Sequence, residues 1–118
     1  MGIGRHLLAD FYGVAPERLR DGALLTRCLV EGAARARLTP VAPPALHRFE
    51  GGGWTGVVLL SESHIAFHTY PEHGYVAVDV FSCGAGRPED AVAVFRAALA
   101  PERESLVESE RGAALAAR

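Results

Sequence analysis

Short apolar runs separated by turn-forming residues extend along most of the chain. Apolar residues spaced by three and four predict a helix that begins after Asp21 and buries Cys28 on its apolar face. A second helix is predicted to begin at Pro88 and to end before Pro101, and the alanine-rich tail from Gly112 is expected to be loose. Segments rich in Val, Ile and aromatic residues predict strands at 6–12, 45–49, 54–60, 64–70 and 75–82, with a further edge strand at 105–108.

The turns between the central strands are too short for parallel crossovers, so neighbouring strands are expected to run antiparallel. This order predicts an α+β fold, a two-layer α/β sandwich whose mostly antiparallel sheet carries two helices on one face. With 118 residues, 49% of them hydrophobic, the chain is expected to form a single domain over 1–118.

Charge and cysteine content exclude several classes of protein. Fourteen acidic against twelve basic side chains leave a net charge of -2, so we expect no nucleic-acid partner. The longest apolar run is too short to cross a bilayer, and residues 1–5 lack the apolar region of a signal peptide. Cys28 and Cys83 are too few to define a disulfide framework, and the chain is therefore expected to be cytoplasmic, with no membrane partner.

Chemically reactive side chains are concentrated in one central stretch. It contains Ser61-Glu62-Ser63-His64, then His68-Thr69-Tyr70-Pro71-Glu72, and then Asp79-Val80-Phe81-Ser82-Cys83-Gly84. A serine in a tightly held turn can attack the preceding carbonyl carbon when donors stabilise the oxyanion and a base is available. A hydrophobic core needs none of these groups, so the stretch indicates catalysis.

This stretch resembles the self-processing region of the small prokaryotic S-adenosylmethionine decarboxylases. The similarity runs nearly end to end, through residues 4–12, 47–49, 56–58 and 108–112, and Ser61-Glu62-Ser63-His64 is its most specific part. The resemblance implies a pyruvoyl-dependent decarboxylase that converts S-adenosylmethionine to its decarboxylated form, the aminopropyl donor of polyamine synthesis. It also implies a homodimer of cleaved protomers.

The resemblance also assigns roles to five residues. Cleavage is expected between Glu62 and Ser63, and Ser63 becomes the pyruvoyl group, whose ketone condenses with the substrate amine as a Schiff base. His68 is the expected processing base, Thr55 aids processing, and Cys83 donates a proton to the decarboxylated product. A neutral imidazole and a thiol both suit such proton transfers near neutral pH.

Substrate recognition is expected from three further positions. Phe49 matches the aromatic side chain that stacks on adenine in the family, and Glu72 matches the carboxylate that holds the ribose diol. Tyr70 is a candidate second aromatic wall. Such groups fit the adenine, diol and sulfonium cation of S-adenosylmethionine.

Strand geometry sets a difficulty for this assignment. Side chains alternate along a strand, so Ser63 and His68 point to opposite faces of it. We therefore expect the strand to bend, bulge or begin after residue 63, so that the two can cooperate.

Three positions depart from the family pattern. Thr55 stands where serine is usual, Tyr70 replaces a common tryptophan, and His73 replaces a common tyrosine. Two alternatives follow. The chain could carry out the same chemistry on arginine or ornithine, smaller substrates whose binding needs fewer aromatic side chains. Alternatively, it could be a non-cleaving homologue with a regulatory role.

No metal site is expected. His64 and His68 lie four residues apart, which in a strand separates them by about 13 Å, so they, His73 and Cys83 make a poor ligand set. Asp79 lies within an apolar strand and would be costly to bury alone, so it is expected to pair with an arginine, Arg5 or Arg48.

Overall fold

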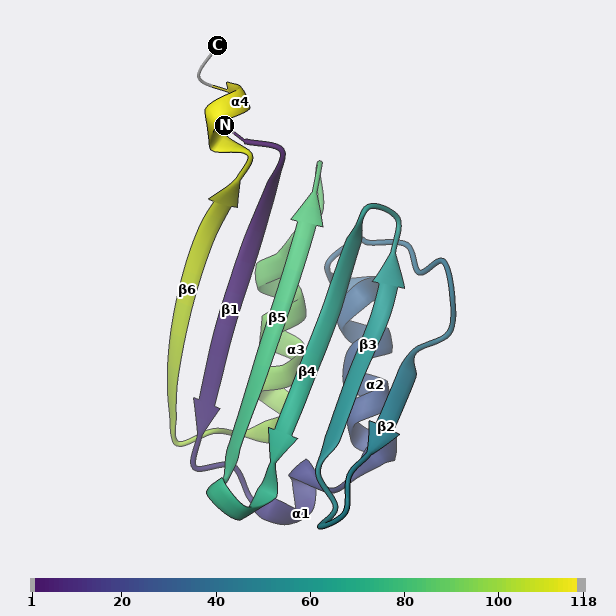
Figure 1. Ribbon diagram of the computed structural model, residues 1–118, viewed down its shortest axis with the longest axis vertical. Coiled ribbons are helices and arrows are strands. Elements are labelled where there is room, and N and C mark those ends of the chain that lie inside the picture. The colour runs from purple at the N-terminus through teal and green to yellow at the C-terminus, as the bar shows by residue number, and fades with distance from the viewer. Residues whose placement is uncertain (1, 117–118) are drawn as a thin grey trace.

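The computed structural model describes residues 2–116. One antiparallel sheet of six strands runs through it in the order β2-β3-β4-β5-β1-β6 (Figure 1). The strands are β1 (Gly4–Tyr12), β2 (Ala45–Arg48), β3 (Trp54–Leu60), β4 (Ser63–Tyr70), β5 (Tyr75–Cys83) and β6 (Arg103–Arg111). The first strand of the chain thus lies between the fifth and the sixth.

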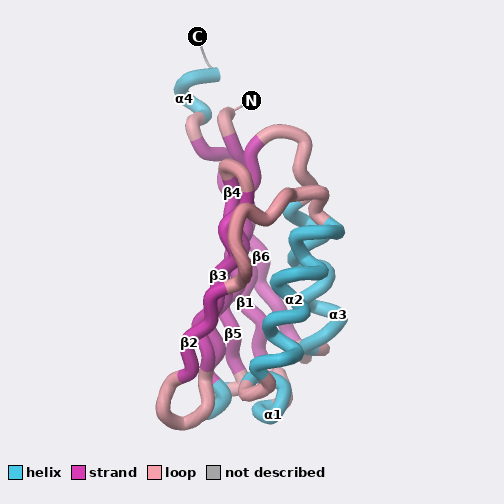
Figure 2. Tube along the Cα trace, turned by 90° about the vertical axis from the view of Figure 1, so that its right-hand side faces the viewer, coloured by secondary structure: helices cyan, strands magenta, loops and turns pink. Residues whose placement is uncertain are grey.

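Two long helices, α2 (Gly22–Arg35) and α3 (Pro88–Leu99), cover one face of this sheet, and the opposite face carries neither of them (Figure 2). The Asp21 carboxylate caps α2 by accepting a hydrogen bond from the Leu24 N–H at 3.0 Å. Among the described residues there are also three short helices: α1 (Pro16–Leu19), the 3₁₀ turn η1 (Pro71–His73) and α4 (Ala113–Ala116). Within residues 2–116, no helix combines the length and apolarity that crossing a membrane demands.

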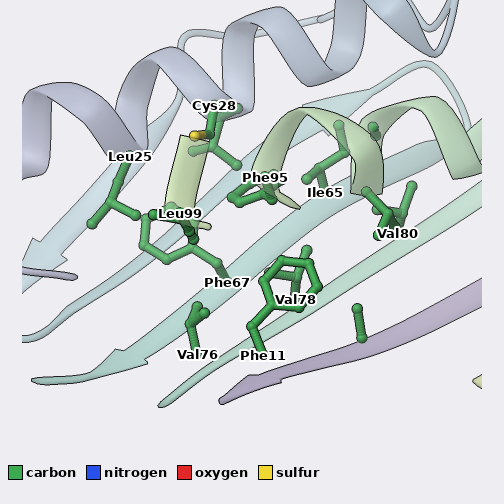
Figure 3. Packing of buried hydrophobic residues seen from close by; sticks show 14 of the residues in the cluster. Phe11, Leu25, Cys28, Ile65, Phe67, Val76, Val78, Val80, Phe95 and Leu99 are labelled. Atoms are coloured by element: carbon green, nitrogen blue, oxygen red, sulfur yellow. The ribbon is translucent and has the colours of Figure 1, made fainter. Parts of the chain in front are cut away.

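The core fills the space between the sheet and the two long helices. Phe11, Phe67 and Phe95 are fully buried there, together with Leu25, and Cys28 joins them at 2% exposure (Figure 3). Burying each large apolar side chain contributes roughly 1.5–3 kcal/mol. This packing stabilises the sheet and fixes which side chains of each strand face the helices.

The sheet face that carries neither long helix is called the bare face here. The alternation of side chains along β4 and β5 determines which residues lie on it. On β4 the buried positions, beginning with Ser63, face the helices, and the alternate positions, including His64 and His68, face away from them. On β5 the half-buried series that faces away includes Asp79 and Cys83. The bare face of the sheet therefore collects polar and titratable side chains.

The predicted architecture is confirmed, with changes at the chain ends. The edge strand is longer than predicted, because β6 pairs with β1 along its whole length from Arg103 to Arg111. The tail after Gly112 begins with the short helix α4 instead of a loose segment, and residues 117 and 118 of the predicted tail lie outside the described residues. Both differences come after residue 102, and the longer strand follows from its pairing with β1.

Candidate active site

A strained turn joins β3 to β4 at the top of the sheet in Figure 1. Leu60 pairs with Ser63, so the turn consists of Ser61 and Glu62 alone. Glu62 has a φ of 60°, in the left-handed region that glycine favours in such turns. A side chain there costs roughly 1–2 kcal/mol. The strain lies directly before the Glu62–Ser63 peptide bond, the bond predicted to be cleaved.

Ser63 and Cys83 come together beside this turn. Ser63 is the first residue of β4 and is 9% exposed, and its Oγ accepts a hydrogen bond from the Cys83 backbone N–H at 3.2 Å. Cys83 ends β5 and carries a free, half-buried thiol. The turn, the serine and the thiol form one group of reactive side chains, which we call the cleavage-end cluster (Glu62, Ser63 and Cys83).

A second group lies toward the other end of the same strands. Thr55 of β3 pairs directly with His68 of β4, and Thr55 Oγ1 lies 2.9 Å from His68 Nδ1, so one of the two donates to the other. The His68 ring is exposed and available to a ligand. Both residues line a cavity of about 650 Å³, and we call them, with the other predicted site residues in its wall, the cavity-end cluster (Phe49, Thr55, His68, Tyr70 and Glu72).

The walls of this cavity are aromatic and acidic. Phe49 is 48% exposed and leans edge-on against His47. Tyr70 is 42% exposed and stacks on Tyr75, with ring centroids 5.5 Å apart. Glu72 lies in η1, after which Gly74 adopts a φ of 59° and turns the chain back into β5. Two exposed aromatic faces and two carboxylates, those of Glu50 and Glu72, therefore surround the same cavity, and Arg20 also lines it.

Tyr75 holds Tyr70 from behind. Its ring lies between Tyr70 and Tyr12, and its hydroxyl donates a short hydrogen bond to Asp10 at 2.5 Å. Burial, followed by this hydrogen bond, raises the pKa of Tyr75, so the phenol stays protonated and remains a donor. The stack fixes the aromatic wall at Tyr70.

The predicted break in β4 is wrong. The strand runs without interruption from Ser63 to Tyr70, and its alternating burial places Ser63 and His68 on opposite faces. Five residues of strand also separate their Cα atoms by roughly 16 Å. The strand stays regular because it pairs with β3 and β5 on both sides. Within one chain, the predicted site residues therefore lie in two separate groups, the cleavage-end cluster and the cavity-end cluster.

The arginine partner predicted for Asp79 is also wrong. Asp79 Oδ1 lies 3.3 Å from His64 Nε2, and its Oδ2 lies 3.8 Å from His6 Nε2. Arg5 instead pairs with Glu89 at 2.7 Å and also with Glu108. Arg5 and His6 are adjacent on β1 and so point to opposite faces, and the histidine is the one that shares the face of Asp79.

One residue at the back of the cavity was missed from the sequence. The Thr69 side chain is 4% exposed; it accepts from the Trp54 N–H at 2.9 Å and donates to the Leu19 carbonyl at 2.8 Å. Trp54 Nε1 in turn donates to the Arg20 carbonyl at 3.0 Å. These bonds join β3, β4 and α1 behind the cavity. A threonine at a core-facing position of a strand was the available signal.

Known proteins of one family are similar to this chain over nearly its whole length. The sequence profile of the family described as S-adenosylmethionine decarboxylase matches residues 5–112. The S-adenosylmethionine decarboxylase proenzyme of Parasynechococcus marenigrum is 45% identical over 105 residues, covering 88% of this chain and 81% of that protein. The proenzyme of Acidithiobacillus ferrooxidans is 40% identical over 111 residues, covering 93% and 83%. The crystal structure of the adenosylmethionine decarboxylase from Aquifex aeolicus superposes with a TM-score of 0.86 at 35% identity, covering 94% of this chain and 92% of that one.

Proposed function

Since this chain belongs to the S-adenosylmethionine decarboxylase family, we propose that it is a proenzyme that cleaves itself between Glu62 and Ser63 and then decarboxylates S-adenosylmethionine. The product is the aminopropyl donor of polyamine synthesis, as expected from the sequence. The observation that carries the proposal is the buried Ser63 hydroxyl, held by the Cys83 N–H directly after the strained Glu62.

Self-cleavage begins at the Ser63 hydroxyl. Its Oγ attacks the carbonyl carbon of Glu62, the C–N bond breaks, and an ester joins the two halves while the nitrogen becomes an amine. A base then removes the α proton of residue 63, which expels Glu62 as a carboxylate. The remaining amine-bearing end takes up water and releases ammonia, and a pyruvoyl group is left at the start of the second fragment.

The residues around Ser63 fit that group. It would begin β4 beside the half-buried Cys83 thiol, whose role is to return a proton to the product. Once formed, the pyruvoyl group supplies a ketone that condenses with the substrate amine and an electron sink for decarboxylation. Free thiols such as Cys83 suit the cytoplasm, where we place the enzyme.

The cavity favours S-adenosylmethionine over a simple amino acid. A volume of about 650 Å³ lies in the range of small-molecule sites, and Phe49 and Tyr70 offer exposed rings to an adenine. The Glu72 carboxylate can accept hydrogen bonds from both hydroxyls of a ribose diol. Arginine and ornithine have no adenine to stack on these rings.

A second copy of the chain would complete the site. Ser63 and His68 cannot meet within one chain, because a continuous strand separates them. We propose a two-fold dimer in which the sheet faces not covered by helices pack against each other, with the strands of the two protomers running antiparallel. The strand ends that carry Glu62, Ser63 and Cys83 in one protomer then lie over the cavity-end cluster of its partner, with the Cys83 side chain on the shared face. His68, hydrogen-bonded to Thr55, becomes the processing base for the other protomer, and each dimer holds two identical sites.

The first test is the denatured mass of the purified protein. We expect two fragments that divide after Glu62, the second having exchanged its amino-terminal amine for a ketone. Ser63→Ala should leave a folded, uncleaved chain, and Cys28→Ala serves as the matched control that still cleaves. An intact mass that persists on long incubation would instead indicate a non-cleaving homologue.

The substrate is tested separately on the cleaved protein. Release of carbon dioxide should be fastest from S-adenosylmethionine, with arginine and ornithine as competitors. Faster release from either amino acid would reassign the substrate and leave the cleavage chemistry intact. Cys83→Ala should cleave yet turn over poorly, and normal turnover in this variant would move the proton donor to another residue.

A further inference from the structure

Three potential metal ligands converge on the bare face of the sheet, away from the cavity-end cluster. His6 comes from β1, His64 from β4 and Asp79 from β5, which lies between the other two strands. Register brings them together, because Phe81 of β5 pairs with both His6 and His64. The candidate ligand atoms of the three residues all lie within 4.8 Å of one another.

Two buried polar atoms of this group make no hydrogen bond within the described residues, although Asp79 Oδ1 lies 3.3 Å from His64 Nε2. His6 Nε2 and Asp79 Oδ1 are both buried, and within residues 2–116 neither takes part in a hydrogen bond. Leaving such atoms unpaired costs about 1–3 kcal/mol each. The side chains themselves keep some exposure, 16% for His6 and 33% for Asp79. A hollow of about 390 Å³, lined by His6, His64 and Arg111 among others, opens beside them and gives an ion a route of entry.

We propose that His6, His64 and Asp79 bind one divalent transition-metal ion, of which Zn²⁺ is the best fit. Two imidazoles and one carboxylate are the ligands of known catalytic zinc and non-haem iron sites. Ligand atoms about 2.0–2.1 Å from a tetrahedral ion lie roughly 3.3 Å apart. The His64–Asp79 distance already equals 3.3 Å, and the His6–Asp79 distance is 3.8 Å, so a small movement of His6 closes the site.

Arg111 contacts His6 and determines which ring nitrogen of His6 carries the proton. Its Nη1 lies 3.3 Å from His6 Nδ1, and a guanidinium can only donate, so His6 Nδ1 accepts and its proton lies on Nε2. A metal at Nε2 needs that proton on Nδ1 instead. Arg111 must therefore withdraw when the ion binds, which its exposed position at the end of β6 permits. In this assignment Arg111 lowers metal affinity through both charge and tautomer.

The test of this site reads metal binding directly and needs no decarboxylation activity. The purified full-length protein is stripped with chelator and titrated with Co²⁺, whose visible absorption reports its ligands, and Zn²⁺ is then used to displace it. We expect one ion per protomer. Asp79→Asn and His64→Gln should each weaken binding by more than about 100-fold, since even losing a residue behind a ligand costs about 10- to 100-fold.

Two further variants complete the design. His47→Gln, an exposed histidine on β2, is the matched control and should bind as the parent does. Arg111→Gln should tighten binding, because the amide oxygen can accept the proton of His6 Nδ1; this variant keeps every ligand, so it tests the site even if a ligand variant fails to fold. Lack of saturable binding, equal binding by Asp79→Asn, or no gain with Arg111→Gln would each overturn the proposal.

Discussion

If each active site is shared between two protomers, two inactive variants should rescue each other. Ser63→Ala lacks the nucleophile but keeps an intact cavity-end cluster, and His68→Ala lacks the base but keeps its own Ser63. A continuous strand puts the two residues on opposite faces, with Cα atoms roughly 16 Å apart, so neither chain can combine them alone. Purified separately, both variants should remain uncleaved, or nearly so.

The size of the rescue follows from symmetry. When the two chains are produced in equal amounts and pair at random, about half of the dimers are mixed. In each mixed dimer the His68→Ala chain has its own Ser63 opposite an intact His68. About a quarter of all chains should therefore be cleaved, and turnover should reach about a quarter of the wild-type value. Denatured mass gives the first number, and carbon dioxide release from S-adenosylmethionine gives the second.

A matched pair controls for general effects of mixing. Ser63→Ala with Cys83→Ala places both changes in the cleavage-end cluster, so mixing these chains should give no turnover beyond that of Cys83→Ala alone. Complete cleavage of His68→Ala by itself would refute the shared site. So would an uncleaved mixture in which mass spectrometry under native conditions finds the mixed dimers.

Three further predictions concern strain, a buried hydroxyl and a buried thiol. Glu62→Gly removes the left-handed strain of about 1–2 kcal/mol, so cleavage should slow by about 5- to 30-fold in a time course of denatured mass. Thr69→Val leaves the Trp54 N–H unpaired behind the cavity and should lower the free energy of unfolding by about 1–3 kcal/mol in urea titrations. Burial raises the pKa of Cys28 from 9.0 to about 11, so its contribution to stability should be lost as pH rises through this range, a loss absent in Cys28→Ser.

Local pattern was enough to predict much of the fold. The bounds of β3 were predicted to the residue, because a run of β-branched and apolar residues ends at a turn on each side. The Asp21 cap and the apolar face around Cys28 were read from helical spacing. Pairing between distant segments was not accessible in this way. The place of β1 between β5 and β6 depends on contacts between residues that are tens of positions apart.

The site shows the same division. Alternation alone predicted that Ser63 and His68 face opposite ways, and the structure agrees; the error was to expect that the strand would deform to unite them. Hydrogen bonding to both neighbouring strands makes such a deformation costly. The group of His6, His64 and Asp79 had no signature in sequence spacing, because its members come from three strands whose register only the fold determines.

If the chain cleaves itself as proposed, the strand order has a consequence for the stability of the cleaved protein. A cut after Glu62 leaves β1, β2 and β3 in one fragment and β4, β5 and β6 in the other. In the sheet, β1 remains inserted between β5 and β6, and β3 remains paired with β4, so the fragments are interleaved along three seams. They cannot part without dismantling the sheet. The precursor folds as one molecule, whereas the matured protein, once denatured, can recover only through an encounter of two chains, and its thermal midpoint depends on concentration. With the proposed cleavage, loss of structure would be nearly irreversible in dilute solution, because the two fragments would have to meet again before the sheet could form.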